Sequence, residues 1–270
     1  MRLPLYQVDA FTDRVFAGNP AAVVPLPDWL PAATMQAIAA ENNLSETAFF
    51  VAEGDGVWGL RWFTPSVEVD LCGHATLATA HVISTILAPG TTDLRFRTQR
   101  AGELRVTAAG DVLTLDFPAR PPHRVEAPEA LLRGLGGPAP QAVLAARDYL
   151  VVYETAEQVA GLAPDMAVVA GLDRMAIVTA PGPAPAGTDD RDGIDFVSRF
   201  FAPGRGIPED PVTGSAHCTL IPYWAERLGR TTLEARQLSR RGGRLRCALA
   251  GDRVRIGGRA VLYLDGHIHV

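Results

Sequence analysis

Two short segments combine a glycine with a polar side chain at points where a helix is expected to begin. They are Gly73-His74 and Gly214-Ser215, which lie 141 residues apart. The first turn of a helix offers unpaired backbone N–H groups and the positive end of the helix dipole, so it favours an anion. A glycine there lets the backbone approach a ligand closely. Each glycine is equally compatible with nothing more than a tight turn from strand to helix.

Three titratable side chains near these segments are candidates for proton chemistry. Glu46 lies between the expected end of a helix and an apolar strand, His74 opens the first helix, and Asp210 precedes the second. A proton shift within an allylic system needs a carboxyl group of raised pKa within reach of two carbons, and it needs no cofactor or metal. A histidine can relay a proton or donate a hydrogen bond. The structural alternatives are a solvated turn for Glu46, a cap for His74 and a turn or helix cap for Asp210.

The composition excludes several other chemistries. All 25 basic residues are arginine. Without lysine there is no pyridoxal-phosphate Schiff base, no lysine aldolase and no Walker-A lysine. Codon bias is the simplest explanation for the missing lysine. The net charge of −5 gives no reason to expect nucleic acid or an anionic membrane as a partner.

The cysteines and the apolar segments indicate the compartment. Cys72, Cys218 and Cys247 are odd in number and show no CxxC spacing, so we expect free thiols in a reducing environment. No signal peptide is visible at the N-terminus, and no stretch offers the 18 or so uninterrupted apolar residues that a membrane-spanning helix requires. We therefore expect a cytoplasmic protein.

Short strands with a few helices between them must position the candidate residues. A chain of 270 residues, 47% of them hydrophobic, can form one large domain or two smaller ones. The pattern predicts a helix over residues 29–40, capped by Asp28, and a second over 74–87 that is apolar nearly all round and must be buried on every side. A proline-rich linker is expected over 118–128. Strands are expected at residues 3–10, 21–25, 47–52, 59–64, 94–97, 102–107 and 112–117.

An internal repeat predicts two similar domains. Residues 61–65 read RWFTP and precede Gly73, while residues 199–203 read RFFAP and precede Gly214, at offsets of 138 and 141 residues. We predict an α+β protein of two domains, 1–118 and 119–270, each a mixed sheet around one buried helix. The second helix would run over 215–228 and contain Pro222. A return of the last strand, 261–270, to the first domain is left open.

Taken together, these segments resemble the phenazine biosynthesis isomerase-like family, which shares its fold with diaminopimelate epimerase. Single motifs are weak, but their order along most of the chain is specific, and only residues 119–190 match less clearly. The resemblance implies an active site in a cleft between two alike domains. The matching segments are residues 7–12, 16–23, 43–49, 61–65, 68–77 and 209–216.

The resemblance also implies a reaction and roles for individual residues. The family's glutamate matches Glu46, which would take a proton from one carbon of a dihydro-hydroxyanthranilate and return it at another without a cofactor. His74 and Asp210 would support catalysis. A homodimer is a further expectation. Substrate binding is assigned to Asn19, Ser45, Gly73, Gly214 and Ser215.

Two other functions remain open at this stage. A two-base epimerase or racemase would use one thiol in each domain. Cys72 occupies the first expected position, but the second falls at Pro211-Val212 and offers no thiol, so this function is disfavoured. A small-molecule binding protein on the same scaffold would need no catalytic residue at all.

Two patterns elsewhere have ordinary explanations. The arginine-rich run over residues 236–246 is typical of a solvated hairpin that turns at Gly242-Gly243. His267 and His269 share one face of the last strand but lack acidic or cysteine partners at the spacing of a metal site, so we expect no metal there.

Overall fold

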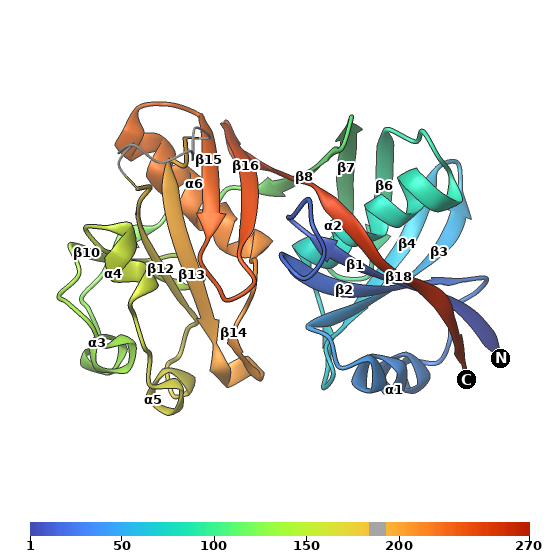
Figure 1. Ribbon diagram of the computed structural model, residues 1–270, viewed down its shortest axis with the longest axis horizontal. Helices are drawn as coiled ribbons and strands as arrows, with labels where there is room; N and C mark the ends of the chain where they lie inside the picture. The colour runs from blue at the N-terminus through green and yellow to red at the C-terminus, as the bar shows by residue number, and fades with distance from the viewer. Residues whose placement is uncertain (184–192) are drawn as a thin grey trace. The chain divides into compact units, whose positions relative to one another are not determined.

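The computed structural model describes residues 1–183 and 193–270. The chain forms two compact units: unit 1 comprises Met1–Asp116 and Gly257–Val270, and unit 2 comprises Phe117–Ile256 (Figure 1). The sequence had assigned 119–270 to the second domain. The last residues group with unit 1 because β18 (Ala260–His269) pairs antiparallel with β1 (Arg2–Ala10). Within the two described ranges, no helix is long and apolar enough to cross a membrane.

Unit 1 is a mixed sheet whose strands enclose a helix. Strands β2 and β3 are parallel, as are β4 and β6, and the other neighbouring pairs are antiparallel. The short β5 (Glu68–Val69) pairs with the end of β4. From β1 the sheet continues through β2 (Asn19–Leu26), β3 (Glu46–Gly54), β4 (Val57–Phe63), β6 (Asp93–Thr98), β7 (Glu103–Ala109) and β8 (Val112–Pro118).

Two helices cover opposite sides of this sheet. Helix α1 (Ala32–Asn42) packs its buried residues against β3 and β4. Helix α2 (Gly73–Val82) packs against β1, β2 and β3 and is buried at every position except His81. Because β2 and the first half of β3 are covered on both faces, they read as nearly continuous apolar runs. Strand β7 alternates buried and exposed residues, as expected for a strand with one solvated face.

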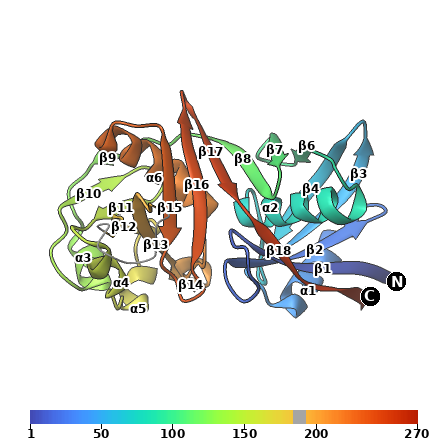
Figure 2. The ribbon, with the colours of Figure 1, turned by 45° about the horizontal axis from the view of Figure 1, so that its top comes forward.

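Unit 2 repeats this topology. Strands β11 and β12 are parallel, as are β13 and β15, whereas the pairs β10–β11, β12–β13 and β15–β16 are antiparallel. Figure 2 shows α6 (Gly214–Leu228) beside these strands. The short strands β9 (His123–Arg124) and β14 (Ile207–Glu209) pair with β10 and β13. The longer strands are β10 (Ala142–Ala145), β11 (Tyr149–Val152), β12 (Ala176–Pro181), β13 (Phe196–Ala202), β15 (Thr232–Gln237), β16 (Gly243–Ala250) and β17 (Arg253–Gly258).

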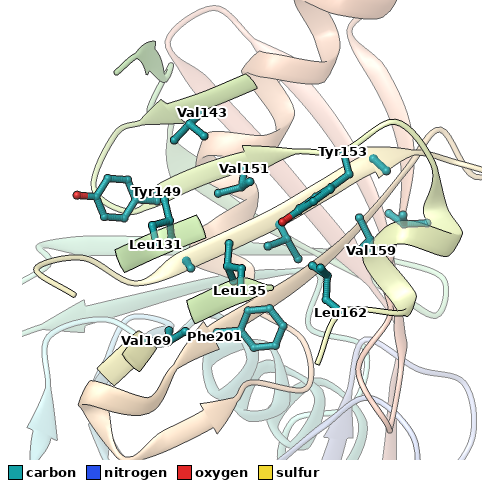
Figure 3. Packing of buried hydrophobic residues seen from close by; sticks show 14 of the residues in the cluster. Leu131, Leu135, Val143, Tyr149, Val151, Tyr153, Val159, Leu162, Val169 and Phe201 are labelled. Atoms are coloured by element: carbon teal, nitrogen blue, oxygen red, sulfur yellow. The ribbon is translucent and has the colours of Figure 1, made fainter. Parts of the chain in front are cut away.

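The helices of unit 2 also lie on two sides of their sheet. Three short helices, α3 (Glu129–Leu135), α4 (Ala156–Ala160) and α5 (Met166–Ala170), pack with the sheet in one apolar cluster, whose aromatic members are Tyr149, Tyr153 and Phe201 (Figure 3). Helix α6 (Gly214–Leu228) packs against β15 and β16 and contains Pro222. Its Trp224 stacks on Phe196 with ring centroids 5.6 Å apart.

One pair of charged residues occupies the same place in both units. Arg61 holds Glu68 through two bonds, Nε–Oε1 at 2.7 Å and Nη2–Oε2 at 2.8 Å. Arg199 holds Glu209 in the same way, at 2.7 and 3.1 Å. Each guanidinium also lies over an aromatic ring two residues further along its strand. The predicted architecture of two similar domains, each a mixed sheet with a central buried helix, is therefore confirmed.

Three local predictions needed correction. Helix α1 begins at Ala32 and not at residue 29, because a residue that precedes a proline is disfavoured in helical conformation and Leu30 precedes Pro31. Asp28 consequently accepts only the N–H of Trp29. The predicted helix over 74–87 changes into a π-helical turn at Ile83–Leu87. The expected linker over 118–128 contains strand β9.

We predict that the repeated ion pair is a major stabilising contact in unit 2. Arg199 is only 11% exposed and also donates Nη1 to the carbonyl oxygens of Val159 and Leu162. Arg199→Met would leave Glu209 and these oxygens without their donor, and should lower the free energy of unfolding by about 3 kcal/mol. Chemical denaturation measures this.

The matched control is Arg105→Met, which removes a surface pair with Asp93 in which the arginine is 60% exposed. Its effect should be much smaller, because exposed pairs contribute little. Equal losses for the two variants would show that the buried pair has no special role.

Candidate active site

The start of α2 in unit 1 lies beside the starts of two strands. Asn19 is the first residue of β2 and Glu46 the first residue of β3. Because these strands are parallel, with Ala21 opposite Glu46, their first residues lie at the same edge of the sheet. His74, the second residue of α2, reaches both of them.

His74 lies between a carboxylate and an amide. Its Nε2 is 3.2 Å from Glu46 Oε2, and its Nδ1 is 3.1 Å from Asn19 Nδ2. The three residues are buried, with Glu46 at 9% the most exposed of them. Neither Glu46 Oε2 nor His74 Nε2 has another hydrogen-bonding partner among the described residues. Of the residues that the structure describes, Glu46 is therefore the one placed to exchange a proton with His74 Nε2.

Two opposing effects set the charge of His74. Burial lowers its pKa, but the interactions with Cys72 and Glu46 raise the pKa well above its usual value. When the ring is protonated, Nδ1 is a donor and pairs with the carbonyl oxygen of the Asn19 amide. When the ring is neutral and Nδ1 is an acceptor, it pairs with the Asn19 N–H. Since the folded-state pKa is raised, His74 stabilises the fold below roughly pH 6.5, and this contribution is lost as the pH rises through the folded-state pKa.

Cys72 contacts the same imidazole, and its thiol is not activated by that contact. Its Sγ lies 3.5 Å from His74 Nδ1. Burial, and then the charge of Glu46, raise the pKa of the thiol to about 11, against the opposing effect of His74. At neutral pH Cys72 is therefore a protonated thiol.

The same three side chains have the types that a thiophilic metal ion binds. One ligand atom each from Glu46, Cys72 and His74 lies within 4.8 Å of the other two. Sulfur, imidazole and carboxylate are the donors that zinc accepts. The expectation that the protein uses no metal remains a prediction, and it is tested below.

Both buried helices begin without a side-chain cap. Cys72 precedes α2 and Thr213 precedes α6, and neither side chain accepts a hydrogen bond from its helix. By contrast, Thr155 and Asp165 cap the short helices α4 and α5 with their side-chain oxygens. A helix start that lacks such a cap suits an acidic group of a ligand.

A glutamine that the sequence analysis did not single out holds the start of α6. Gln237, the last residue of β15, is fully buried. Its Oε1 accepts the N–H of Thr213 at 2.9 Å, and its Nε2 donates to the carbonyl oxygen of Asp210 at 2.8 Å. Thr213 in turn donates its hydroxyl to Asp210 Oδ2. Gln237 thereby fixes the backbone that carries Asp210 into the helix.

The predicted site residues fall into two groups. In unit 1, Asn19, Glu46, Gly73 and His74 lie together, and the half-buried Ser45 directly precedes Glu46. In unit 2, three residues lie at the start of α6: Asp210, Gly214 and Ser215.

Gln237 could have been recognised from the sequence. Leu233, Ala235 and Gln237 alternate along β15 and are its buried positions, so a polar residue continues an apolar face. The arginines that follow Gln237 hide this pattern. The arginine-rich run over residues 236–246 does form a hairpin, because β15 and β16 are antiparallel neighbours.

Comparison with known proteins identifies close relatives. A family profile described as phenazine biosynthesis-like protein (PhzC-PhzF) matches residues 8–266. An uncharacterized isomerase of Pseudomonas aeruginosa is 53% identical over the full length of both chains.

Solved structures agree with this relationship. The phenazine biosynthesis PhzF-family protein of Enterococcus faecalis is 47% identical, with a TM-score of 0.93 over all of both chains. A hydroxyproline epimerase from Agrobacterium vitis, 12% identical, shares the fold with a TM-score of 0.59 over 99% of this chain and 92% of its own.

We predict that Cys72 is unreactive in the folded protein. With a pKa of about 11, roughly one thiol in a thousand is ionised at pH 8, and only the thiolate attacks an alkylating reagent. Mass spectrometry after treatment with iodoacetamide should find Cys72 unlabelled in the native state and fully labelled in denaturant. Labelling of native Cys72 at the rate of a free thiol would mean that the side chain is an accessible thiolate, as a thiol-dependent epimerase requires.

Proposed function

The chain belongs to the phenazine biosynthesis-like (PhzC-PhzF) family, and we propose that it is an isomerase that shifts a proton on a small cyclic or amino-acid-like carboxylate without a cofactor. The observation that carries this proposal is the buried pair of Glu46 and His74, 3.2 Å apart. The reaction would be similar to that of a dihydro-hydroxyanthranilate isomerase.

Glu46 is the acid and base of this mechanism. Its carboxylate takes a proton from one carbon, the double bond shifts along the allylic system, and the carboxylic acid returns the proton at the second carbon. No atom or electron is gained or lost, so the step needs no co-reactant. General acid–base catalysis by one such group typically contributes about 10²- to 10⁴-fold in rate.

His74 is the supporting group beside Glu46. Its Nε2 lies 3.2 Å from Glu46 Oε2, and an Nε2–H there would hold that carboxylate in one orientation. Asn19 holds the other ring nitrogen and so fixes the plane of the ring. These contacts limit the motion of Glu46, and a fixed base is the condition for efficient transfer.

The remaining predicted residues have binding roles in this proposal. The uncapped first turn of α2, with Gly73, and the residues Ser45 and Asn19 would contact the reacting part of the ligand. The uncapped first turn of α6, with Gly214 and Ser215, and Asp210 would hold its polar groups. Backbone N–H groups at a helix start suit a carboxylate.

The internal repeat argues against a two-base epimerase. The residue before α2 is Cys72, and its counterpart before α6 is Thr213. The residue of unit 2 that corresponds to Cys72 is therefore Thr213, and not Pro211 or Val212 as expected from the sequence. The counterpart of Glu46 in unit 2 is Met175, which is not acidic. Thr47 pairs with Phe63 as Ala176 pairs with Phe201, and Glu46 and Met175 are the residues that directly precede Thr47 and Ala176. One carboxyl group in unit 1 fits an enzyme that returns the proton it took.

The proposal is tested by deuterium exchange at carbon. A panel of cyclic and amino-acid carboxylates is incubated with the protein in D₂O and followed by proton NMR. For any compound that the wild type exchanges, Glu46→Gln should lower the rate by at least about 100-fold, because the amide cannot accept a proton. The matched control Glu103→Gln changes an exposed glutamate of β7 and should leave the rate unchanged.

Two further arms separate the alternatives. EDTA should leave the wild-type rate unchanged, and loss of activity with EDTA would mean that a metal ion takes part. A thiol-dependent epimerase predicts that Cys72→Ser abolishes exchange while Glu46→Gln retains it. A binding protein predicts no exchange with any compound that binds.

A further inference from the structure

An arginine that no motif singled out reaches the start of α6. Arg147 lies in the turn between β10 and β11, and its Nη2 donates to Ser215 Oγ at 3.0 Å. Ser215 is the second residue of α6, one turn before Cys218. This contact brings a guanidinium to a helix start whose N–H groups have no side-chain cap.

The neighbouring carboxylate fixes the orientation of Arg147. Asp148 is buried and accepts Nε at 3.2 Å and Nη2 at 3.0 Å. These bonds and the bond to Ser215 use Nε and Nη2, whereas Nη1 makes no hydrogen bond to any described residue. The side chain is 40% exposed. One end of a rigid, planar cation is thus held by protein and the other end is left for a partner.

The internal repeat relates the turn that carries Arg147 to the start of β2 in unit 1. Ala22 pairs with Thr47, which pairs with Phe63, and Tyr149 pairs with Ala176, which pairs with Phe201. Ala22 and Tyr149 therefore occupy the same place in the two sheets.

The residues just before these two positions make equivalent contacts. Asn19 lies three residues before Ala22 and reaches His74, the second residue of α2. Arg147 lies two residues before Tyr149 and reaches Ser215, the second residue of α6. The two positions differ by one residue in register, but in each unit a side chain just before the strand contacts the second residue of the buried helix: a neutral amide in unit 1 and a cation in unit 2.

A second guanidinium adds to the positive charge near the first turns of α6. Arg120 donates its backbone N–H to the carbonyl oxygen of Cys218 at 2.8 Å, and its Nη1 is buried without a hydrogen-bonding partner among the described residues. Burial raises the pKa of Cys218 to about 11, and the charges of Arg120 and Arg147 oppose that rise. Both arginines are therefore close enough to act on a group at this helix.

We propose that Arg147 is the specificity-determining residue that selects an anionic group on the ligand, with its free Nη1 and Ser215 Oγ as the contacts. This inference rests on the proposed function, because it assigns a recognition residue for the ligand of that reaction. It specifies a ligand whose carboxylate is ionised at neutral pH and excludes the corresponding neutral amide. Arginine suits this role because its planar fork matches a carboxylate and stays charged.

The test compares binding of two named probes by isothermal titration calorimetry. Anthranilate is a planar cyclic amino carboxylate, and anthranilamide is its neutral amide. Arg147→Met should raise the Kd of anthranilate about 10- to 100-fold, the effect expected for loss of one charged hydrogen bond, and should leave anthranilamide unchanged. Arg147→Lys should recover part of the affinity.

Matched controls separate recognition from folding. Arg246→Met removes the same charge from a side chain that is 58% exposed and should leave both Kd values unchanged. Thermal melting of each variant identifies loss of fold. Equal weakening of anthranilate and anthranilamide would assign Arg147 a structural role only, and an unchanged Kd for anthranilate, or no binding of it by the wild type, would overturn the proposal.

These outcomes are separable from those of the proton-transfer experiment. Calorimetry measures binding and does not depend on the base. If Glu46→Gln retains exchange, the proposed function fails while the selectivity of Arg147 still stands as measured. If Arg147→Met binds as the wild type does, the selectivity fails while the role of Glu46 is unaffected.

Discussion

A helix that is buried on nearly every side must still satisfy the N–H groups of its first turn, and this constraint organises both units. A polar side chain at the position before the helix is the usual solution. Helices α4 and α5 use it, whereas α2 and α6, which pack against the longer strands, do not. The start of α2 instead lies beside Asn19 and Glu46 at the starts of β2 and β3, and the start of α6 lies beside Gln237 at the end of β15. The fold thus has two helix starts without a side-chain cap, and an acidic group of a ligand suits such a position.

The two units use the same architecture for different chemistry. Both hold an arginine and a glutamate together beside the strand that leads to the buried helix, which fixes the path of the chain into the helix. At the helix start unit 1 places a carboxylate, an imidazole and a thiol, of which only the first two are suited to proton transfer at neutral pH. Unit 2 places a buried glutamine, an aspartate and an arginine there.

The strands and buried helices were predictable from the sequence because alternation and continuous apolar runs report directly on burial. The start of α1 was not, because Pro31 overrides an apparent cap at Asp28. Glu46 and His74 stood out by type and position. Gln237 and Arg147 did not, because their importance depends on contacts across 24 and 68 residues that no local pattern encodes.

The central claim is that Glu46 and His74 form a charged pair in which the carboxylate keeps the buried imidazole protonated. Nitrogen-15 NMR of the histidine side chains as a function of pH tests it most directly. We predict that His74 titrates well above pH 6.5 in the wild type, and that in Glu46→Gln its pKa falls, because burial remains while the anion is removed. The buried His217, whose pKa burial lowers to about 4, should be unchanged and serves as an internal reference. A His74 that is neutral at pH 6, or one whose pKa does not respond to the loss of Glu46, would contradict the account.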